Sequence, residues 1–296
     1  MIEGIVTAVA FKEFEELSSA ERDAILVLLE DEDPAVQDLL VERLVGFGPA
    51  VLDWLASESV GRNGVARRRV DLVKEQLGRR RHDDAFLDFC IRSESDIDLE
   101  EGMWRLALAE YPLVSIAGYR ALIDSFSEVL NERLHGVGGG KPTLSVINRY
   151  LFDELEFVGN DGDYFDPENS FLNRVVDRRK GIPISLSVLF LLIAQRLSLP
   201  VQGIGMPGHF LCRYQSTRCE YYIDAFNRGR LFSKADCVRF LNGTEFGYRI
   251  EYLEPVSTRA ILLRSCQNLL QIYLRRGDQD RSCRIQRYVK ALSRPR

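Results

Sequence analysis

The feature that most constrains the fold of this chain is an almost uninterrupted apolar segment between residues 184 and 197. Apolar residues at positions 186, 188 to 194 and 197 leave almost no polar side on a helical wheel of 3.6 residues per turn. We therefore expect a helix that is buried on nearly all sides and forms the centre of a domain. Pro183 marks its start, because proline is tolerated in a first helical turn. Pro200 marks its end, because the residue before a proline is displaced from helical geometry.

Two short β-like runs follow the predicted helix and carry residues suited to catalysis. The first runs from Val201 to Tyr214 and contains His209, and the second ends at Asp224. Thiol-type acyl-transfer sites use this order of elements: a buried helix, then a strand with a histidine, then a strand that ends in an aspartate. In such sites the helix N-terminus lowers the pKa of the nucleophile, the histidine accepts its proton and the aspartate orients the ring. His209 and Asp224 are therefore candidate catalytic residues.

Five segments between residues 157 and 229 extend this pattern: Phe157–Asn160, Tyr164–Ser170, Arg178–Ser187, Pro207–Leu211 and Ile223–Gly229. In this order they resemble the transglutaminase-like superfamily, and within it the bacterial SirB-type branch, whose core also occurs in some eukaryotic F-box proteins. The resemblance implies an α+β fold with a papain-like or transglutaminase-like core. It also implies that His209 is the base and Asp224 the residue that orients it.

The nucleophile position departs from this resemblance. Transglutaminase-type enzymes place a cysteine after a glycine and one intervening residue at the start of the central helix, and here that position is Pro183. No cysteine lies between positions 90 and 212, and the nearest hydroxyl groups belong to Ser185 and Ser187. This departure argues against thiol catalysis.

Ser185 and Ser187 each have two interpretations. A serine hydroxyl needs a base within hydrogen-bond reach to act as a nucleophile, and His209 is the candidate base. Alternatively, a serine in a first helical turn bonds to the local backbone, which is the interpretation that we favour. The sequence does not choose between Ser185 and Ser187. We interpret Cys212, three residues after His209, as a small core residue.

A polar, turn-rich segment lies just before the central helix and contains Asn160, Asp166 and Asn169. Asparagine and aspartate side chains in such segments bond to the backbone of their own turns. The resemblance leaves a second role open, in which these residues line a binding cleft together with Pro183 and Asn227.

Composition and charge limit the class of protein. The 296 residues are enough for two domains, and 39 basic against 44 acidic residues give a net charge of −5, which does not indicate nucleic-acid binding. The six cysteines are irregularly spaced without a C-x-x-C pair, so we expect no metal site and no cofactor. We recognise no signal peptide, and the longest apolar run is too short to cross a bilayer. A reduced, cytoplasmic protein without a membrane segment is expected.

The glycine-rich segment 135–142 is similar to a phosphate-binding loop only in composition. Such a loop needs a glycine at its first position and a serine or threonine directly after its lysine, where this chain has His135 and Pro142. No β-like run precedes the segment. We interpret it as a flexible hinge.

Helical patterns flank the core on both sides. On the N-terminal side, a capping box at Ser18 and Glu21 and the pair Asp33–Pro34 mark two helix starts. Further expected features are a helix from Ala50, helices at 65–77 and 83–90, an acidic connector at 93–102, and helices at 103–111 and 115–134. Short helices alternate with breaks at Asp33–Pro34 and Gly48–Pro49, and this alternation is typical of HEAT-like helical pairs.

We expect four segments: a helical N-terminal region, HEAT-like in part, at 1–134; the hinge at 135–142; the transglutaminase-like core at 143–255; and a tetratricopeptide-like helical hairpin at 256–296. A single hairpin of this kind does not bury its own apolar face and must pack on the core or on a partner.

The sequence favours a non-catalytic scaffold that binds a protein or peptide partner, because partner-binding flanks accompany a core without the expected cysteine. The alternative is a hydrolase or acyltransferase that uses Ser185 or Ser187 with His209 and Asp224. A third interpretation, a regulator of gene expression, is opposed by the acidic charge and the lack of a basic reading helix.

Overall fold

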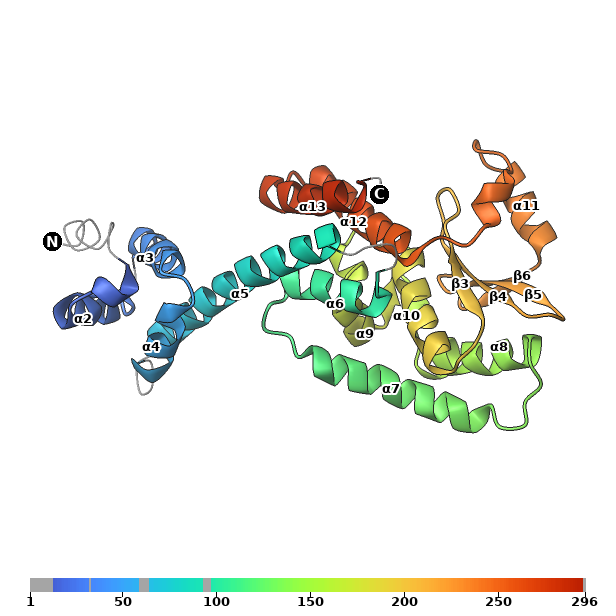
Figure 1. Cartoon of the computed structure of the whole chain (residues 1–296), viewed down its shortest axis with the longest axis horizontal. Coiled ribbons are helices and arrows are strands. Elements are labelled where there is room, and N and C mark those ends of the chain that lie inside the picture. The colour runs from blue at the N-terminus through green and yellow to red at the C-terminus, as the bar shows by residue number, and fades with distance from the viewer. Residues whose placement is uncertain (1–12, 32, 59–63, 93–96, 295–296) are drawn as a thin grey trace. The chain divides into compact units, whose positions relative to one another are not determined.

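The computed structural model describes residues 13–31, 33–58, 64–92 and 97–294 (Figure 1). The chain divides into two compact units. Unit 1 comprises residues 1–84 and 108–113, and unit 2 comprises residues 85–107 and 114–296. Part of the acidic connector expected at 93–102 lies outside the described residues, and α6 (Leu99–Glu110) already begins within its last positions.

Unit 1 is helical in its described part. Its elements are a 3₁₀ turn (Phe14–Glu16), α2 (Ser19–Leu28), α3 (Pro34–Gly46), α4 (Ala50–Glu58) and the first part of α5 (Gly64–Arg92). The predicted capping box is confirmed, because the Ser18 side chain accepts a hydrogen bond from Glu21 N–H and the Glu21 carboxylate accepts one from Ser18 N–H at 2.9 Å. The predicted start of α3 is also confirmed, since Asp33 Oδ1 accepts from Ala35 N–H at 2.9 Å.

The helix α5 differs from the sequence prediction. Two helices were expected, at 65–77 and 83–90, whereas the structure has one continuous helix from Gly64 to Arg92. Only Gly78 interrupts the pattern between them, and a single glycine costs a helix about 1 kcal/mol, which packing overrides. Val70 and Val73 of this helix are buried in the apolar core of unit 1, together with Leu44, Val51 and Leu55.

Unit 2 contains most of α6 and the second part of α5. Its other helices are α7 (Ile116–Arg133), α8 (Lys141–Asn148), a π-helical turn (Arg149–Glu154), a 3₁₀ turn (Pro167–Asn169), α9 (Leu172–Arg178), α10 (Pro183–Arg196), α11 (Lys234–Asn242), a 3₁₀ turn (Ile250–Leu253), α12 (Thr258–Arg276) and α13 (Gln279–Leu292). The last two form the predicted helical hairpin, with Gly277 in the left-handed conformation at the break. No helix in the described part of the chain is long and apolar enough to cross a membrane.

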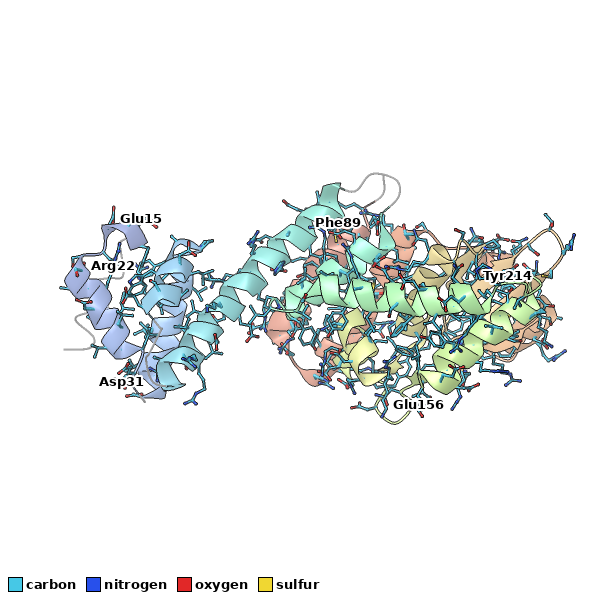
Figure 2. All side chains as sticks on the ribbon, turned by 90° about the horizontal axis from the view of Figure 1, so that it is seen from below. Glu15, Arg22, Asp31, Phe89, Glu156 and Tyr214 are labelled. Atoms are coloured by element: carbon cyan, nitrogen blue, oxygen red, sulfur yellow. The ribbon has the colours of Figure 1, made fainter. Side chains whose placement is uncertain are left out.

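Two small sheets lie in unit 2. The strands β1 (Val158–Gly159) and β2 (Lys180–Gly181) pair in parallel, and β3 (Val201–Ile204), β4 (Leu211–Gln215), β5 (Glu220–Asp224) and β6 (Arg230–Phe232) form an antiparallel sheet in sequence order. Tyr214 on β4, labelled in Figure 2, accepts a hydrogen bond from Gly140 N–H at 3.3 Å, which fixes the end of the glycine-rich segment to the sheet.

Two details of the sheet correct the sequence prediction. His209 was expected on a strand but lies in the turn between β3 and β4, where Gly208 has a φ of +70° and His209 N–H donates to the Met206 carbonyl. The sequence of residues 248–253 also suggests a last strand or an extended segment, whereas Ile250–Leu253 form a 3₁₀ turn. Proline, which lacks an N–H, and glycine, which tolerates positive φ, favour a turn before His209.

The helix α10 is the centre of unit 2, as predicted. It packs against α7, α9, α12 and the strands β3 and β4, and Figure 1 shows it beside the sheet. Nearly all of its side chains are buried, with Gln195 the exposed exception. Arg196 in its last turn forms ion pairs with Glu100 at 2.9 Å and Asp124 at 2.5 Å.

We predict that Ile193→Ala lowers the free energy of unfolding by about 2–5 kcal/mol, because it removes buried methyl groups and leaves a cavity. Ile193 is 0% exposed, and the matched control Ile250→Ala changes a side chain that is 56% exposed. The control should lose at most about 0.5 kcal/mol. Urea unfolding measures both, and equal losses would contradict the central position of α10.

Candidate functional site

His209 and Asp224 lie in contact in unit 2. His209 Nε2 is 2.8 Å from Asp224 Oδ2, and the His209 side chain is 14% exposed while the aspartate is almost fully buried. The aspartate is the last residue of β5 and the histidine precedes β4, so pairing of these neighbouring strands brings the two side chains together. The pair therefore has the geometry in which an aspartate orients an imidazole ring.

Asn227 completes the surroundings of Asp224. Its backbone N–H donates to Asp224 Oδ1 at 3.2 Å, and its side chain donates to Asp224 Oδ2 at 2.8 Å. Burial alone raises the pKa of Asp224, but the hydrogen bond and charge of His209 and the two bonds from Asn227 outweigh it and lower the pKa below its usual value. Asp224 is thus held as a carboxylate in a fixed orientation.

Two cavities of unit 2 share His209 as a wall. The first, which we call the Arg264 cavity, has a volume of about 590 Å³, and its lining includes Pro183, Gly208, His209 and Arg264. The second, which we call the Phe240 cavity, has a volume of about 480 Å³, and its lining includes Asp224, Asn227, Phe226 and Phe240 as well as His209. The rings of Phe226 and Phe240 each lie 6.3 Å from the imidazole ring, centroid to centroid.

Pro183 is the first residue of α10 and lines the Arg264 cavity with His209. This is the place where the resemblance implies a nucleophile, at a helix N-terminus that faces the histidine. Proline has no group that can act as a nucleophile or donate a proton, so this position of the cavity wall is chemically inert.

The hydroxyl of Ser185 is bonded to the backbone. It donates to the Asn169 carbonyl at 2.6 Å and accepts from Ile182 N–H at 3.0 Å, and the side chain is buried. Among the described residues it makes no hydrogen bond to His209. The geometry fits a serine that holds together the start of α10 and the preceding turn.

Ser187 and Cys212 are also buried, and the side chain of each lies against a backbone carbonyl. Ser187 Oγ lies 3.5 Å from the Phe210 carbonyl, and Cys212 Sγ lies 3.5 Å from the Ser187 carbonyl. Burial raises the pKa of Cys212 to about 12. Such a thiol stays protonated at neutral pH and behaves as a core residue, as the sequence predicted.

The polar segment before α10 forms a bonded turn. Asn160 Nδ2 donates to Asn169 Oδ1 at 3.0 Å, and Asn169 Nδ2 donates to the Asp163 carbonyl at 2.7 Å. Asp166 caps the following 3₁₀ turn and forms an ion pair with Arg178 at 2.6 Å. Of the residues expected to line a cleft, Pro183 and Asn227 line the two described cavities, whereas Asn160, Asp166 and Asn169 are not among the residues lining them.

Sequence reasoning missed the polar face of α12. Arg264, Gln267, Asn268 and Gln271 all line the Arg264 cavity. They are spaced by three, four and seven residues, which places them on one side of a helix. The spacing is visible in the sequence, but the sequence does not show that this side of the helix borders His209.

No group of three or more metal-ligating side chains occurs within the described segments. The His209–Asp224 pair supplies only two such side chains, and one of them is already used to orient the other. The chemistry that the site can offer is therefore hydrogen bonding and proton exchange by the imidazole, together with the charge of Arg264.

The small antiparallel sheet against a central buried helix, with a histidine and an aspartate on adjacent strands or turns, defines a transglutaminase-like core. Residues 117–267 match the family described as the Transglutaminase-like superfamily, and the chain belongs to this superfamily.

Several curated proteins are similar to the chain. A UPF0162 protein of Xylella fastidiosa (strain 9a5c) is 34% identical over 186 residues, which cover 60% of this chain and 66% of that protein. A UPF0162 protein of Pseudomonas aeruginosa is 26% identical over 192 residues, covering 64% of this chain and 69% of that protein. F-box only protein 21 of Homo sapiens is 30% identical over 196 residues, covering 55% of this chain and 30% of that protein. No solved structure matches the chain.

We predict that Asp224→Asn destabilises the protein in a pH-dependent way. The folded-state pKa of Asp224 is lowered, and an unfolded aspartate titrates near pH 3.9, so ionisation stabilises the fold above about pH 4. This stabilisation is lost as pH falls through the folded-state pKa. The variant should lose about 1–3 kcal/mol at neutral pH, and the difference from wild type should shrink in acid.

Urea unfolding at neutral pH and at about pH 3 measures this difference. Asp161→Asn, which changes an exposed aspartate of the same Phe240 cavity, is the matched control and should have little effect. A pH-independent loss for Asp224→Asn would contradict a stabilising carboxylate.

Proposed function

We propose that this protein is a non-catalytic member of the superfamily that binds a protein or peptide partner through the Arg264 cavity. The observation that carries the proposal is Pro183, which occupies the first turn of α10 in the same cavity as His209. The two nearby serines support it, because the hydroxyl groups of Ser185 and Ser187 lie against backbone groups. A cavity with an intact wall but no nucleophile is suited to binding rather than to group transfer.

The flanks and the relatives support a partner-binding role. We propose that the chain belongs to the SirB-type branch and acts in the cytoplasm, with HEAT-like pairing in unit 1 and a tetratricopeptide-like hairpin in α12 and α13. Helical repeats of these kinds are partner-binding architectures. A relative named F-box only protein 21 is in keeping with a role in protein interaction.

The alternative function is a hydrolase or acyltransferase with Ser185 or Ser187 as nucleophile. The observation in its favour is the His209–Asp224 pair, whose 2.8 Å contact is the arrangement needed to orient a general base. The experiments below separate the two functions.

We predict that Pro183→Cys creates a reactive thiol. A helix N-terminus and a neighbouring histidine both lower the pKa of a thiol, which raises the fraction of thiolate at neutral pH. We expect alkylation by iodoacetamide roughly tenfold faster than at the exposed Cys283 of the same molecule. Mass spectrometry of labelled peptides gives the two rates separately.

The double variant Pro183→Cys with His209→Ala is the control, and it should lose most of this acceleration. Equal rates at positions 183 and 283 would show that Pro183 does not stand in a nucleophile's place.

We predict that Gln271→Trp weakens peptide binding at least about tenfold. Gln271 is exposed on α12 and lines the Arg264 cavity, so an indole there fills space that a peptide would occupy. Gln279→Trp changes an exposed glutamine of α13 that does not line the cavity and is the matched control. A library of short labelled peptides, measured by fluorescence anisotropy, gives the affinities.

Mass spectrometry of the same peptides after incubation tests for catalysis. The proposal expects them to be recovered unchanged. Cleaved or acyl-transferred products that disappear in Ser185→Ala or Ser187→Ala would overturn it in favour of the alternative.

A further inference from the structure

We propose that the Arg264 cavity takes an extended peptide segment and holds an acidic side chain of that segment on the Arg264 guanidinium. This inference rests on the proposed partner-binding function and adds the chemistry of the partner. Four properties of the cavity support it: an arginine without an acidic partner among the described residues, a lining without carboxylates, a row of carboxamides, and apolar surface beside that row.

Arg264 is a half-buried cation whose described contacts include no carboxylate. Its Nη2 donates to the His209 carbonyl at 2.9 Å, and the guanidinium carbon lies 5.8 Å from the centre of the Phe210 ring. Burial lowers the pKa of Arg264, an effect only partly offset by Tyr164. Among the described residues no carboxylate offsets this partly desolvated charge, and an anion in the cavity would do so.

Two other half-buried arginines of unit 2, Arg178 and Arg196, are neutralised by carboxylates of the chain. Arg178 contacts the carboxylates of Asp166 and Glu168 at 2.6 and 2.8 Å. Arg196 contacts those of Glu100 and Asp124. Arg264 differs from these two in having no carboxylate among its described contacts, which leaves its charge available to an anion in the cavity.

The wall of the cavity favours an anion. None of its lining residues is an aspartate or a glutamate, although the chain as a whole carries 44 acidic residues and a net charge of −5. The Phe240 cavity, which is also lined by His209, is different, because its lining includes Asp161, Asp224 and Asp236. A carboxylate that enters the Arg264 cavity meets an arginine and no acidic side chain of its wall.

The polar row on α12 matches the main chain of a peptide. Gln267, Asn268 and Gln271 follow Arg264 on one side of the helix, and the row from 264 to 271 rises about 10 Å. About three residues of an extended peptide cover the same distance. Each carboxamide has both donors and an acceptor, so it can bond to the N–H and C=O groups of such a chain.

Apolar groups beside the row favour a peptide over a small free anion. Leu274, one turn beyond the row, is 62% exposed, and Ile184 and Tyr164 also line the cavity. These surfaces gain from covering the side chains of an adjacent peptide. The carboxamide row extends two turns of α12 beyond Arg264. A bound peptide therefore places an acidic side chain on Arg264, and its main chain continues along the helix.

The test uses a positional-scanning library of short, labelled peptides that are N-acetylated and C-amidated, so that the only carboxylate is a side chain. Matched sets differ by glutamate, glutamine or lysine at one position. With the full-length protein we expect glutamate peptides to bind roughly tenfold more tightly than their glutamine counterparts. The preference should weaken at high salt, because it is electrostatic.

Two variants assign this preference to Arg264. Arg264→Gln should abolish it, and Arg264→Lys should keep part of it, because the charge remains without the planar fork. Arg276→Gln is the matched control, since Arg276 is exposed on the same helix and does not line the cavity. Thermal melts of each variant confirm folding. The preference is the ratio of the affinities of one protein sample for glutamate and glutamine peptides, so it does not depend on the fraction of active protein.

The outcomes separate the inference from the proposed function. Peptides that bind equally well with glutamate, glutamine or lysine would overturn the acidic-ligand inference and leave the scaffold function intact. A preference that appears only with a free C-terminal carboxylate, in a non-amidated arm of the library, would overturn the side-chain assignment. Failure of every peptide to bind, with the protein folded, would overturn both.

Discussion

The burial of α10 is the constraint on which the rest of unit 2 depends. A helix with apolar side chains on almost every side has to be covered by several elements, and here helices and the adjacent strands β3 and β4 of a small sheet cover it. Because its flanks are packed, its first turn is fixed in place. Pro183 and Ser185 are therefore held at defined positions, and the turn before the helix is bonded to the same serine. The N-terminal end of α10 therefore fixes the positions of the residues around it in the candidate site.

The His209–Asp224 pair is held in a fixed orientation by a chain of hydrogen bonds. The carboxylate is oriented by two bonds from Asn227, and the imidazole is oriented by the carboxylate. These interactions also stabilise the turns next to β4 and β5, so they have a structural value that is independent of chemistry. An ordered histidine in a cavity can serve as a hydrogen-bonding wall as well as a base.

Much of the helical structure was predictable because its signals are local. The periodicity of α10, the capping box at Ser18 and the helix start at Asp33–Pro34 each depend on a few neighbouring residues. The continuity of α5 was not predictable, because packing decides whether a helix tolerates Gly78. The short strand β6 was missed, since three residues carry no periodicity and are ordered by pairing with β5.

The candidate site was likewise predictable only in part. The order of His209 and Asp224 along the chain indicated that they would meet, because adjacent antiparallel strands bring such residues together. Arg264 was not identified, since its role depends on α12 packing beside residues that lie far away in the sequence. Likewise, the hydrogen bond between Ser185 and the Asn169 carbonyl joins segments whose register the sequence does not fix.

His209 and Gly208 border both cavities, and this shared wall has a thermodynamic consequence. A ligand in one cavity that shifts the imidazole changes the shape and the hydrogen-bonding capacity of the other cavity. Linkage requires the coupling to be reciprocal, so each ligand would alter the affinity for the other by the same factor. His209 can therefore couple ligand binding in the Arg264 cavity to ligand binding in the Phe240 cavity, whether or not it transfers protons.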